Sequence, residues 1–197
     1  MFLGESIMVS FKIRLNHLIS VERTLLMILF TTIIPLALLL GVSFLITVAL
    51  HELGHAIPAL LMTRDDVTIY IGSLGDPYKS FRLSFGRLEL YCKYNPLLWY
   101  KGCCVATDYH LSTDQRLLFV AGGPIASLIG TIITWLLLSL VEHQDFLRIL
   151  TGGVFVLCLL GTLGSLIPWF RVRYTASGHP VYNDGYQIFR LLRAKLR

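Results

Sequence analysis

The chain has 197 residues, of which 55% are hydrophobic, and a formal net charge of +5. Its mean hydropathy of +0.68 is typical of membrane proteins, and its length allows a single compact domain, residues 1–197. The sequence has no basic stripe interleaved with aromatic residues, as a folded nucleic-acid-binding surface would have. We therefore expect a lipid bilayer, and no nucleic acid, among its partners.

Three long apolar segments predict membrane-spanning helices. A helix needs about 20 residues to cross the hydrocarbon core of a bilayer, so each of the two later segments fits one span. The segments cover residues 25–62, 117–141 and 146–170, and the later two predict spans at about 117–141 and 148–170.

The first apolar segment is too long for one crossing. It forms either one long helix or two spans, at 25–41 and 43–62, with a tight turn near Gly41. Charge favours two spans: with four spans in all, every Lys and Arg except Arg148 falls on one side of the membrane. The sequence thus predicts a multi-pass protein of the cell membrane with both termini in the cytoplasm.

Residues 63–116 have a different pattern, in which apolar and polar residues alternate. The alternation covers residues 67–71, 81–85 and 88–92, and Gly-containing turns separate the stretches. It predicts a small antiparallel sheet with one apolar face, lying at the cytoplasmic membrane surface. We expect the segment from Tyr70 to Tyr91 to hold an extended peptide along an exposed strand edge.

The four cysteines are Cys92, Cys103, Cys104 and Cys158. None belongs to a Cys-x-x-Cys pair, and neighbouring Cys103 and Cys104 are poorly placed to bridge each other. We interpret all four as reduced, structural thiols.

The sequence His-Glu-Leu-Gly-His, at residues 51–55, places ionisable side chains inside the first apolar segment. On a helix, His51 and His55 lie one turn apart, so both imidazoles can bind one ion. Glu52 lies on the same side, where a carboxylate can act on a water bound to zinc. A buried polar network that only joins helices is the alternative. The energetic penalty of a charged group in a membrane span favours a catalytic metal site.

These residues resemble the site-2 proteases, which are intramembrane zinc metallopeptidases. Two further segments carry the resemblance, which covers most of residues 43–190. The segment AGGPIAS resembles the family's Gly-x-x-x-(Asn/Ser/Gly) element through Gly123 and Ser127. SLIP, at 165–168, and NDG, at 183–185, resemble its Asn-x-x-Pro and Leu-Asp-Gly signatures.

The resemblance implies that Asp184 is the third ligand of one Zn²⁺ ion, beside His51 and His55, with Glu52 as the catalytic base. Two departures from the family pattern stand out: Ser165 replaces an Asn, and the stretch between Pro168 and Asp184 is long. That stretch contains His179, a rival ligand. A loop histidine before proline is more often solvated, so Asp184 is preferred.

Stripes of small residues recur every four positions in the later apolar segments, at Gly122, Ala126, Gly130 and Thr134, and again at Gly161 and Ser165. Such stripes let helix backbones approach closely in lipid. They predict packing within the chain around His51, with dimerisation as the alternative.

The basic C-terminal tail, residues 171–197, ends in an amphipathic pattern with Arg190, Arg193 and Lys195 opposite apolar residues. It predicts a helix on the inner membrane leaflet, or else an ordinary cytoplasmic helix.

The predicted fold is an all-α multi-span membrane protein with three or four transmembrane helices and a small membrane-surface β element between the catalytic span and the next. The predicted function is zinc-dependent cleavage of membrane-spanning proteins or signal-peptide remnants. The resemblance is to a minimal family member without PDZ or CBS modules, so the core or an adaptor would select substrates. A non-proteolytic scaffold with a structural zinc site is the alternative, and a metal transporter is a weaker one. The sequence does not indicate an oligomeric state.

Overall fold

The computed structural model of this chain is largely helical, and its described part contains two small sheets. The described residues are Arg14, 17–106, 111–141, 145–170, 172–175, Gly178 and 180–196. The chain divides into two compact units, residues 1–39 and 40–197, which we describe separately. Within the described residues, three helices are long and apolar enough to cross a membrane: His17–Met62, Thr113–Leu140 and Phe146–Leu166.

The described part of the first unit is helical and almost entirely exposed. It contains a wide helical turn, η1 (Leu29–Ile33), which ends two residues before Pro35. Proline has no backbone N–H, so the carbonyl of Thr31 loses the partner that it would have four residues later. Wider turns of this kind are a common way for a helix to accommodate such a missing bond.

Helix α2 (Ile34–Met62) is continuous through residues 41–43, so the predicted turn near Gly41 is wrong. The first apolar segment therefore forms one candidate span, at His17–Met62, and not two. Backbone hydrogen bonding explains the difference. A tight turn within an apolar segment would leave N–H and C=O groups without partners in lipid, whereas a helix satisfies them internally.

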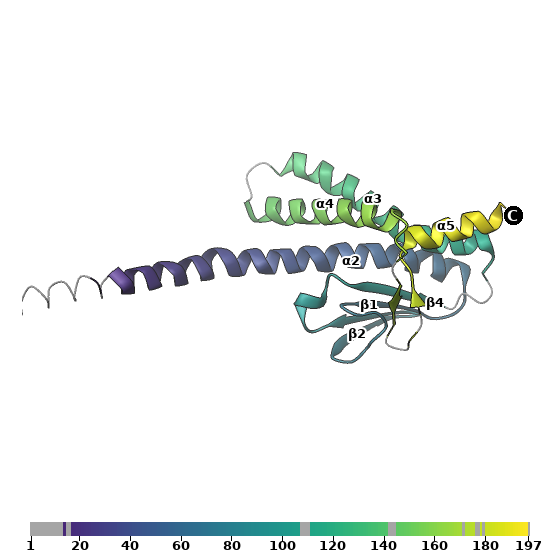
Figure 1. Cartoon of the computed structure of the whole chain (residues 1–197), viewed down its shortest axis with the longest axis horizontal. Helices are drawn as coiled ribbons and strands as arrows, with labels where there is room; N and C mark the ends of the chain where they lie inside the picture. The colour runs from purple at the N-terminus through teal and green to yellow at the C-terminus, as the bar shows by residue number, and fades with distance from the viewer. Residues whose placement is uncertain are drawn as a thin grey trace, which may run out of the picture. The chain divides into compact units, whose positions relative to one another are not determined.

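The two later spans match helices α3 (Thr113–Leu140) and α4 (Asp145–Leu166). Helix α3 begins at a capping box, in which Ser112 accepts from the backbone N–H of Gln115 and the Gln115 side chain accepts from that of Ser112. Figure 1 shows α3 and α4 on one side of α2 and the larger sheet on the other.

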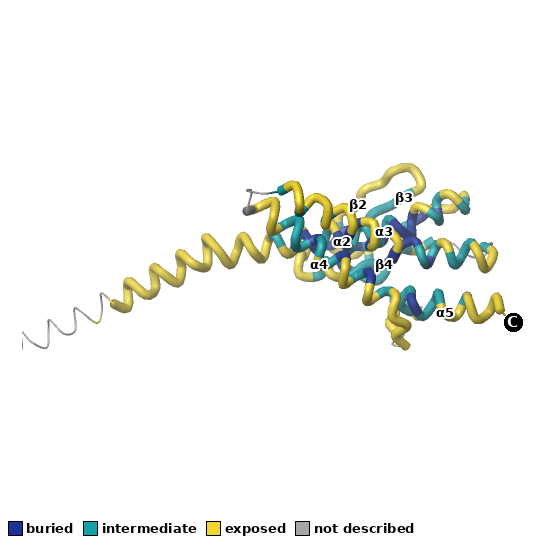
Figure 2. The backbone as a smooth tube through the Cα atoms, turned by 90° about the horizontal axis from the view of Figure 1, so that it is seen from above, coloured by how far each residue is buried: buried dark blue, intermediate teal, exposed yellow. Residues whose placement is uncertain are grey.

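Small residues of α3 pack within the chain, as the first stripe predicts. A Cβ on Gly122 would lie 2.0 Å from the carbonyl oxygen of Gly54 in α2. A Cβ on Gly130 would lie 2.4 Å from Leu50 and 3.1 Å from the Cys158 sulfur. These glycines let α2, α3 and α4 approach closely around the middle of α2. Figure 2 shows buried positions in this region.

The larger sheet has four strands in the order β2-β3-β1-β4. Its strands are β1 (Val67–Ile71), β2 (Ser80–Phe85), β3 (Leu88–Lys93) and β4 (Gly102–Ala106). The prediction of a purely antiparallel sheet is wrong, because β1 and β3 pair in parallel while the other pairs are antiparallel. The β2–β3 hairpin folds back so that β3 lies beside β1. This position lets β3 place Cys92 in the same core as β1.

The sheet packs on α2 through the alternating side chains that the sequence singles out. Val67, Ile69 and Ile71 of β1 are almost completely buried, in one core with Ala56 and Ala59 of α2. On β2 the expected apolar face stays largely exposed, because β2 is an edge strand beyond the cover of the helix.

Arg87, in the β2–β3 turn, joins the sheet to the end of α2. Its guanidinium donates to the carbonyl oxygens of Thr63, at 2.6 Å, and Leu60, at 2.8 Å. A cation that binds the last carbonyls of a helix also interacts favourably with the helix dipole. The sheet is therefore fixed to α2 only a few residues after the His-Glu-Leu-Gly-His sequence.

The tail contains more structure than a single helix. Strands β5 (Arg173–Tyr174) and β6 (Pro180–Val181) pair in antiparallel fashion, and helix α5 (Asp184–Lys195) follows them. Helix α5 contacts α3 and α4. Lys195, near its end, forms an ion pair with Asp114 of α3 at 2.6 Å.

Candidate metal centre

His51 and His55 project from α2 into a common space, as their spacing predicts. Their Nε2 atoms lie 3.3 Å apart, and the two rings meet edge to face. The His55 side chain is 8% exposed and that of His51 19%. Two imidazoles are thus held with one nitrogen each directed to the same point, within a mostly buried setting.

Asp184, the first residue of α5, completes the group. One carboxylate oxygen lies 3.1 Å from Nε2 of His51, and the other lies 3.6 Å from Nε2 of His55. One ligand atom from each of the three residues falls within 4.8 Å of the others, so the group could hold a metal ion. Residues separated by 133 positions in the sequence therefore meet at one site.

The start of α5 is fixed against the end of α4, and this placement brings Asp184 to the histidines. Asn183 caps α5 by accepting from the backbone N–H of Tyr186, while its amide donates to the carbonyl oxygen of Ile167. A Cβ on Gly185 would lie 2.4 Å from the carbonyl oxygen of Leu166. Only glycine allows this contact, so the Asp-Gly pair combines a ligand with a close helix approach.

Burial raises the pKa of Asp184, but its hydrogen bonds with His51 and His55 outweigh this effect and bring the pKa to about 2. The carboxylate is consequently ionised at neutral pH. This is the state in which a carboxylate binds a cation.

The other ring nitrogens of the histidines have partners on α3. Nδ1 of His55 lies 2.9 Å from the carbonyl oxygen of Phe119, and Nδ1 of His51 lies 2.9 Å from Oγ of Ser127. A carbonyl only accepts, so Nδ1 of His55 carries a proton, and Nε2 is the nitrogen that would bind a metal ion in the site. Such outer contacts fix the tautomer and the ring orientation of a metal ligand.

Gly123 of α3 forms the wall behind the two rings. A Cβ at this position would lie 2.3 Å from Nε2 of His55 and 2.8 Å from Nε2 of His51. Any side chain there would occupy the space that the ligand atoms need. Gly123 and Ser127, which the sequence connected to the site only by resemblance, both touch it.

Replacement of Ser127 by alanine is expected to lower the affinity for a divalent cation by about 10- to 100-fold, because the His51 ring loses the partner that orients it. Competition with a chelating indicator measures the affinity. Ser165→Ala is the matched control, since the Ser165 hydroxyl faces the same pocket but bonds to the carbonyl of Thr162 in its own helix. Equal cation affinities for the two variants would show that Ser127 has no role in orienting the His51 ring.

Glu52 lies beside the histidines and is 6% exposed. The backbone N–H of Cys104 in β4 hydrogen-bonds to its carboxylate. A Cβ on Gly102 would lie 2.3 Å from a carboxylate oxygen of Glu52. Strand β4 therefore passes close to this side chain and needs glycine to do so.

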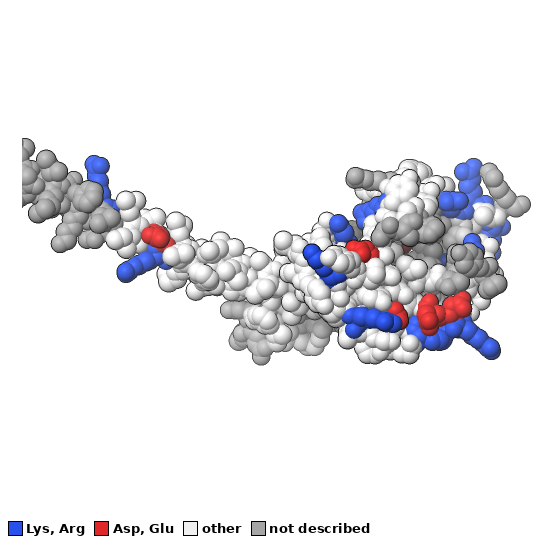
Figure 3. All heavy atoms as spheres, turned by 90° about the horizontal axis from the view of Figure 1, so that it is seen from below, with Lys and Arg blue, Asp and Glu red and all other residues white. Residues whose placement is uncertain are grey.

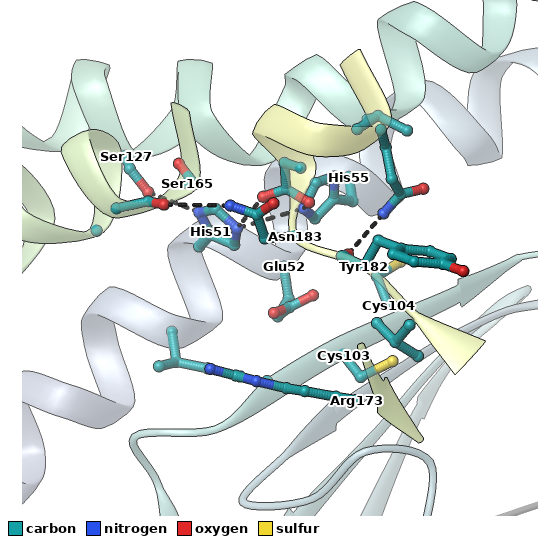
Figure 4. Close-up of a pocket in the computed structure, with 18 of the residues that line it drawn as sticks. His51, Glu52, His55, Cys103, Cys104, Ser127, Ser165, Arg173, Tyr182 and Asn183 are labelled. Atoms are coloured by element: carbon teal, nitrogen blue, oxygen red, sulfur yellow. Dashed lines mark hydrogen bonds and ion pairs between the residues drawn. The ribbon is translucent and has the colours of Figure 1, made fainter. Parts of the chain in front are cut away.

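All four residues line one pocket of about 580 Å³. Figure 4 shows His51, Glu52 and His55 on the helix side of this pocket and Cys103 and Cys104 on the strand side. The pocket is wider than a metal ion requires. Its walls come from α2, β4, the helices α3 and α4, and the segment that leads into α5.

The cysteines are not part of the metal group found within the described chain. All four are free. Burial raises the pKa of the Cys103 thiol to about 12 and also raises that of Cys104, and the negative charge of Glu52 adds to both effects. Protonated thiols are poor ligands and nucleophiles, which supports a structural role. The rival ligand His179 lies outside the described residues.

The comparisons with known proteins assign no family. No protein-family model matches the chain, and no curated protein matches it.

Several residues of the site give no signal in the sequence. Phe119 and Cys104 contribute backbone atoms, which do not depend on side-chain identity. Gly102 is one glycine among 16, and only the packing of β4 on Glu52 gives it a role. Asn183 is the exception, because an Asn directly before a helix is a recognisable cap.

Proposed function

We propose that the chain is an intramembrane zinc metalloprotease similar to the site-2 proteases, which hydrolyses peptide bonds of membrane-spanning proteins or signal-peptide remnants. One observation carries the proposal. Glu52 lies buried in the same pocket as a His51–His55–Asp184 group, on a helix that is apolar enough to cross a membrane. A buried carboxylate beside three converging ligands is the arrangement that metal-assisted hydrolysis requires.

The ligand set and its spacing support zinc. Neutral imidazole nitrogens and a carboxylate are common zinc ligands, and two ligands on a tetrahedral ion at about 2.0–2.1 Å are separated by roughly 3.3 Å. The distances of 3.1, 3.3 and 3.6 Å between the facing atoms lie around this value.

When bound, zinc would act as a Lewis acid and lower the pKa of a water molecule to about 7. Glu52 would accept a proton from the attacking water and then deliver it to the nitrogen of the departing amine. The N–H of Cys104 holds the carboxylate in place for both steps. Burial of Glu52 keeps competing water away from it.

The alternative, a scaffold with a structural zinc site, has less support. Structural zinc sites are usually closed by four protein ligands, whereas the metal group in the described chain has three. An open fourth position beside Glu52 favours hydrolysis. A transporter would need polar ligands along several spans, and the buried polar residues of α3 and α4 are Ser and Thr.

An extended substrate could be held by strand β4. Within residues 70–91 only β2 is an edge strand, because Tyr70 and Tyr91 lie on the central strands β1 and β3. Strand β4 is the other edge, and Gly102, Cys103 and Cys104 of this strand line the pocket. We therefore place the presenting edge on β4 and not on the segment that the sequence indicated.

The pairing register identifies which groups of β4 point outward. The N–H of Gly72 bonds to the carbonyl of Lys101, and hydrogen-bonded pairs alternate along an antiparallel ladder. The N–H groups of Gly102, Cys104 and Ala106 consequently point away from β1. The N–H of Cys104 already binds Glu52, so a peptide main chain would pair with this edge through its other outward groups.

Ala106→Pro should lower the cleavage rate about fivefold, which corresponds to the loss of one main-chain hydrogen bond of about 1 kcal/mol. Ala106 suits the test because its N–H does not pair with β1, and it lies beyond the residues that contact Glu52. Zinc content should stay unchanged. Ala106→Val, which keeps the N–H, is the control, and equal rates for the two variants would exclude pairing at this position.

Topology follows from the number of spans. Termini on the same side require an even number, but the described chain has three candidate spans. We propose that the segment 63–116 and the tail, which hold most of the Lys and Arg residues, are cytoplasmic, and that the N-terminus lies on the opposite side.

Single cysteines placed near either end, in a background without the four native thiols, can be labelled from outside intact cells with a membrane-impermeant maleimide. We expect labelling near the N-terminus and none near the C-terminus. If neither end were labelled, both termini would lie in the cytoplasm, which requires an even number of spans, as the distribution of Lys and Arg first suggested.

The function itself is tested by incubating purified, zinc-loaded protein in nanodiscs with a fluorogenic transmembrane peptide. Cleavage that disappears with a chelator and returns with added zinc is expected. A metal-loaded protein that cleaves no member of a panel of transmembrane peptides would favour the scaffold.

A further inference from the structure

A second pocket, of about 560 Å³, lies on the sheet side of the molecule. Three lysines line it: Lys79, Lys93 and Lys101. Figure 3 shows Lys and Arg side chains spread over the face that carries the sheet. The metal centre does not use this pocket, so its basic lining needs a separate account.

The lysines differ in their charge balance. Lys93 is 7% exposed, and its ammonium group forms an ion pair with Asp76 at 2.6 Å. Lys79 and Lys101 have no carboxylate partner among the residues that the structure describes, and each lies over a tyrosine ring, at 5.4 and 5.2 Å. The pocket thus has a neutral pair at Lys93 and two uncompensated positive charges.

The backbone at Lys79 is also unusual. Its φ of 52° lies in the left-handed region, and it is the one non-glycine residue with positive φ among the described residues. Glycine would adopt this conformation without strain, but the position carries a long cationic side chain. Strained backbone clusters at active sites and ligand clamps, so the strain at Lys79 supports a binding role for the pocket that it lines.

The two pockets are neighbours. Leu74 lines both of them, and on β5 Arg173 lines the first pocket while Tyr174 lines the second. Successive residues of a strand point to opposite faces, so β5 forms a wall between the pockets. Arg173 also has no carboxylate partner in the described chain, and Figure 4 shows its side chain extended into the first pocket.

We propose that the second pocket binds an acidic stretch of the polypeptide whose bond is cut at the metal centre, with Lys79 and Lys101 as specificity-determining residues. This inference rests on the proposed protease function. A polypeptide that passes Leu74 would meet Lys79 and Lys101 in one pocket and Arg173 in the other. Arg173 extends the positively charged lining from the second pocket into the pocket that contains Glu52. A lipid headgroup would occupy the second pocket alone, whereas a peptide could contact both pockets, so the arrangement favours a peptide.

Binding can be measured without hydrolysis in the Glu52→Gln protein, zinc-loaded and held in phosphatidylcholine nanodiscs. The probes are fluorescent transmembrane peptides that differ only in a flanking run of Glu, Gln or Lys, placed on either side. Lys79→Glu with Lys101→Glu should weaken binding of the Glu peptide about tenfold, as expected for two reversed, partly exposed charges. The same double variant should leave the Gln peptide unchanged and bind the Lys peptide more tightly.

Lys79→Arg with Lys101→Arg is the matched control and should keep the preference for the Glu peptide. High salt should reduce that preference, because the Debye length falls to about 3 Å at 1 M. The proposal would be overturned if the Lys79→Glu, Lys101→Glu variant lost the same binding affinity for the Glu and Gln peptides, or lost none for either.

Two further results distinguish acidic-peptide binding from proteolysis and from lipid binding. One outcome is that binding depends on peptide charge although the unchanged protein, with Glu52 in place, cleaves no peptide. In that case the proposed protease function is wrong, but the second pocket still binds an acidic segment. If binding ignores peptide charge, but adding phosphatidylglycerol to the nanodiscs stimulates cleavage only when Lys79 and Lys101 are present, the pocket binds a lipid headgroup and the proposal is overturned.

Discussion

Glu52→Gln is expected to keep the metal and lose nearly all turnover. Gln fills the same space and can still accept from the N–H of Cys104, but it cannot take a proton from water. General acid–base catalysis contributes about 10²- to 10⁴-fold, and this residue would serve in both the first and the second proton transfer. We therefore expect a loss near the upper end of that range in kcat, measured with the transmembrane peptide.

Two measurements make this result specific. Metal analysis should give the same zinc content for Glu52→Gln and the unchanged protein, since Glu52 is not one of the three facing ligands. Glu89→Gln is the matched control, because Glu89 lies on β3 and pairs with Arg82 away from the pocket. Wild-type turnover by Glu52→Gln would exclude the hydrolytic mechanism.

Asp184→Ala should lose both metal and activity. Removal of the carboxylate leaves two imidazoles to hold the ion and takes away the one negatively charged ligand of the group. Loss of one of three protein ligands is expected to lower zinc affinity by more than the roughly 10- to 100-fold seen when an outer partner is lost. Zinc content after dialysis against a weak chelator, together with cleavage rate, measures both effects.

Controls for Asp184 address its neighbours. Asp184→Asn keeps the size of the side chain, so a similar loss of zinc in this variant would assign the effect to charge and not to the packing of α5. His179→Ala should leave zinc and activity nearly intact. If zinc were lost only from the His179 variant, His179 and not Asp184 would be the third ligand.

The helical spacing of His51, Glu52 and His55 was enough to predict that they share one face, because α-helical periodicity is local. Asp184 could be reached only through resemblance. Its position depends on the contact of Gly185 with Leu166 and on Asn183, and both are tertiary interactions between segments that sequence spacing does not relate. The α4–α5 approach, and not the length of the intervening stretch, decides where the carboxylate lies.

The errors in the predicted fold have a common origin. The turn near Gly41 was favoured by loop charges, which report on the sides of a membrane and not on backbone hydrogen bonding. In the sheet, alternation correctly indicated the buried side chains of β1, but it does not specify which strands are neighbours. The pairing of β3 with β1 placed Tyr70 and Tyr91 at the centre and left β4 as the edge beside Glu52.

The division of the three candidate metal ligands between α2 and α5 also has a consequence for biosynthesis. His51 and His55 are made early, whereas Asp184 follows 133 residues after His51. At roughly 5–20 residues per second, a nascent chain spends on the order of ten seconds with only two of the three residues of this group made. A proteolytic centre of the proposed kind would stay inert beside the translocon, where unfolded membrane segments are abundant, until α3, α4, the β5–β6 hairpin and Asp184 have been added.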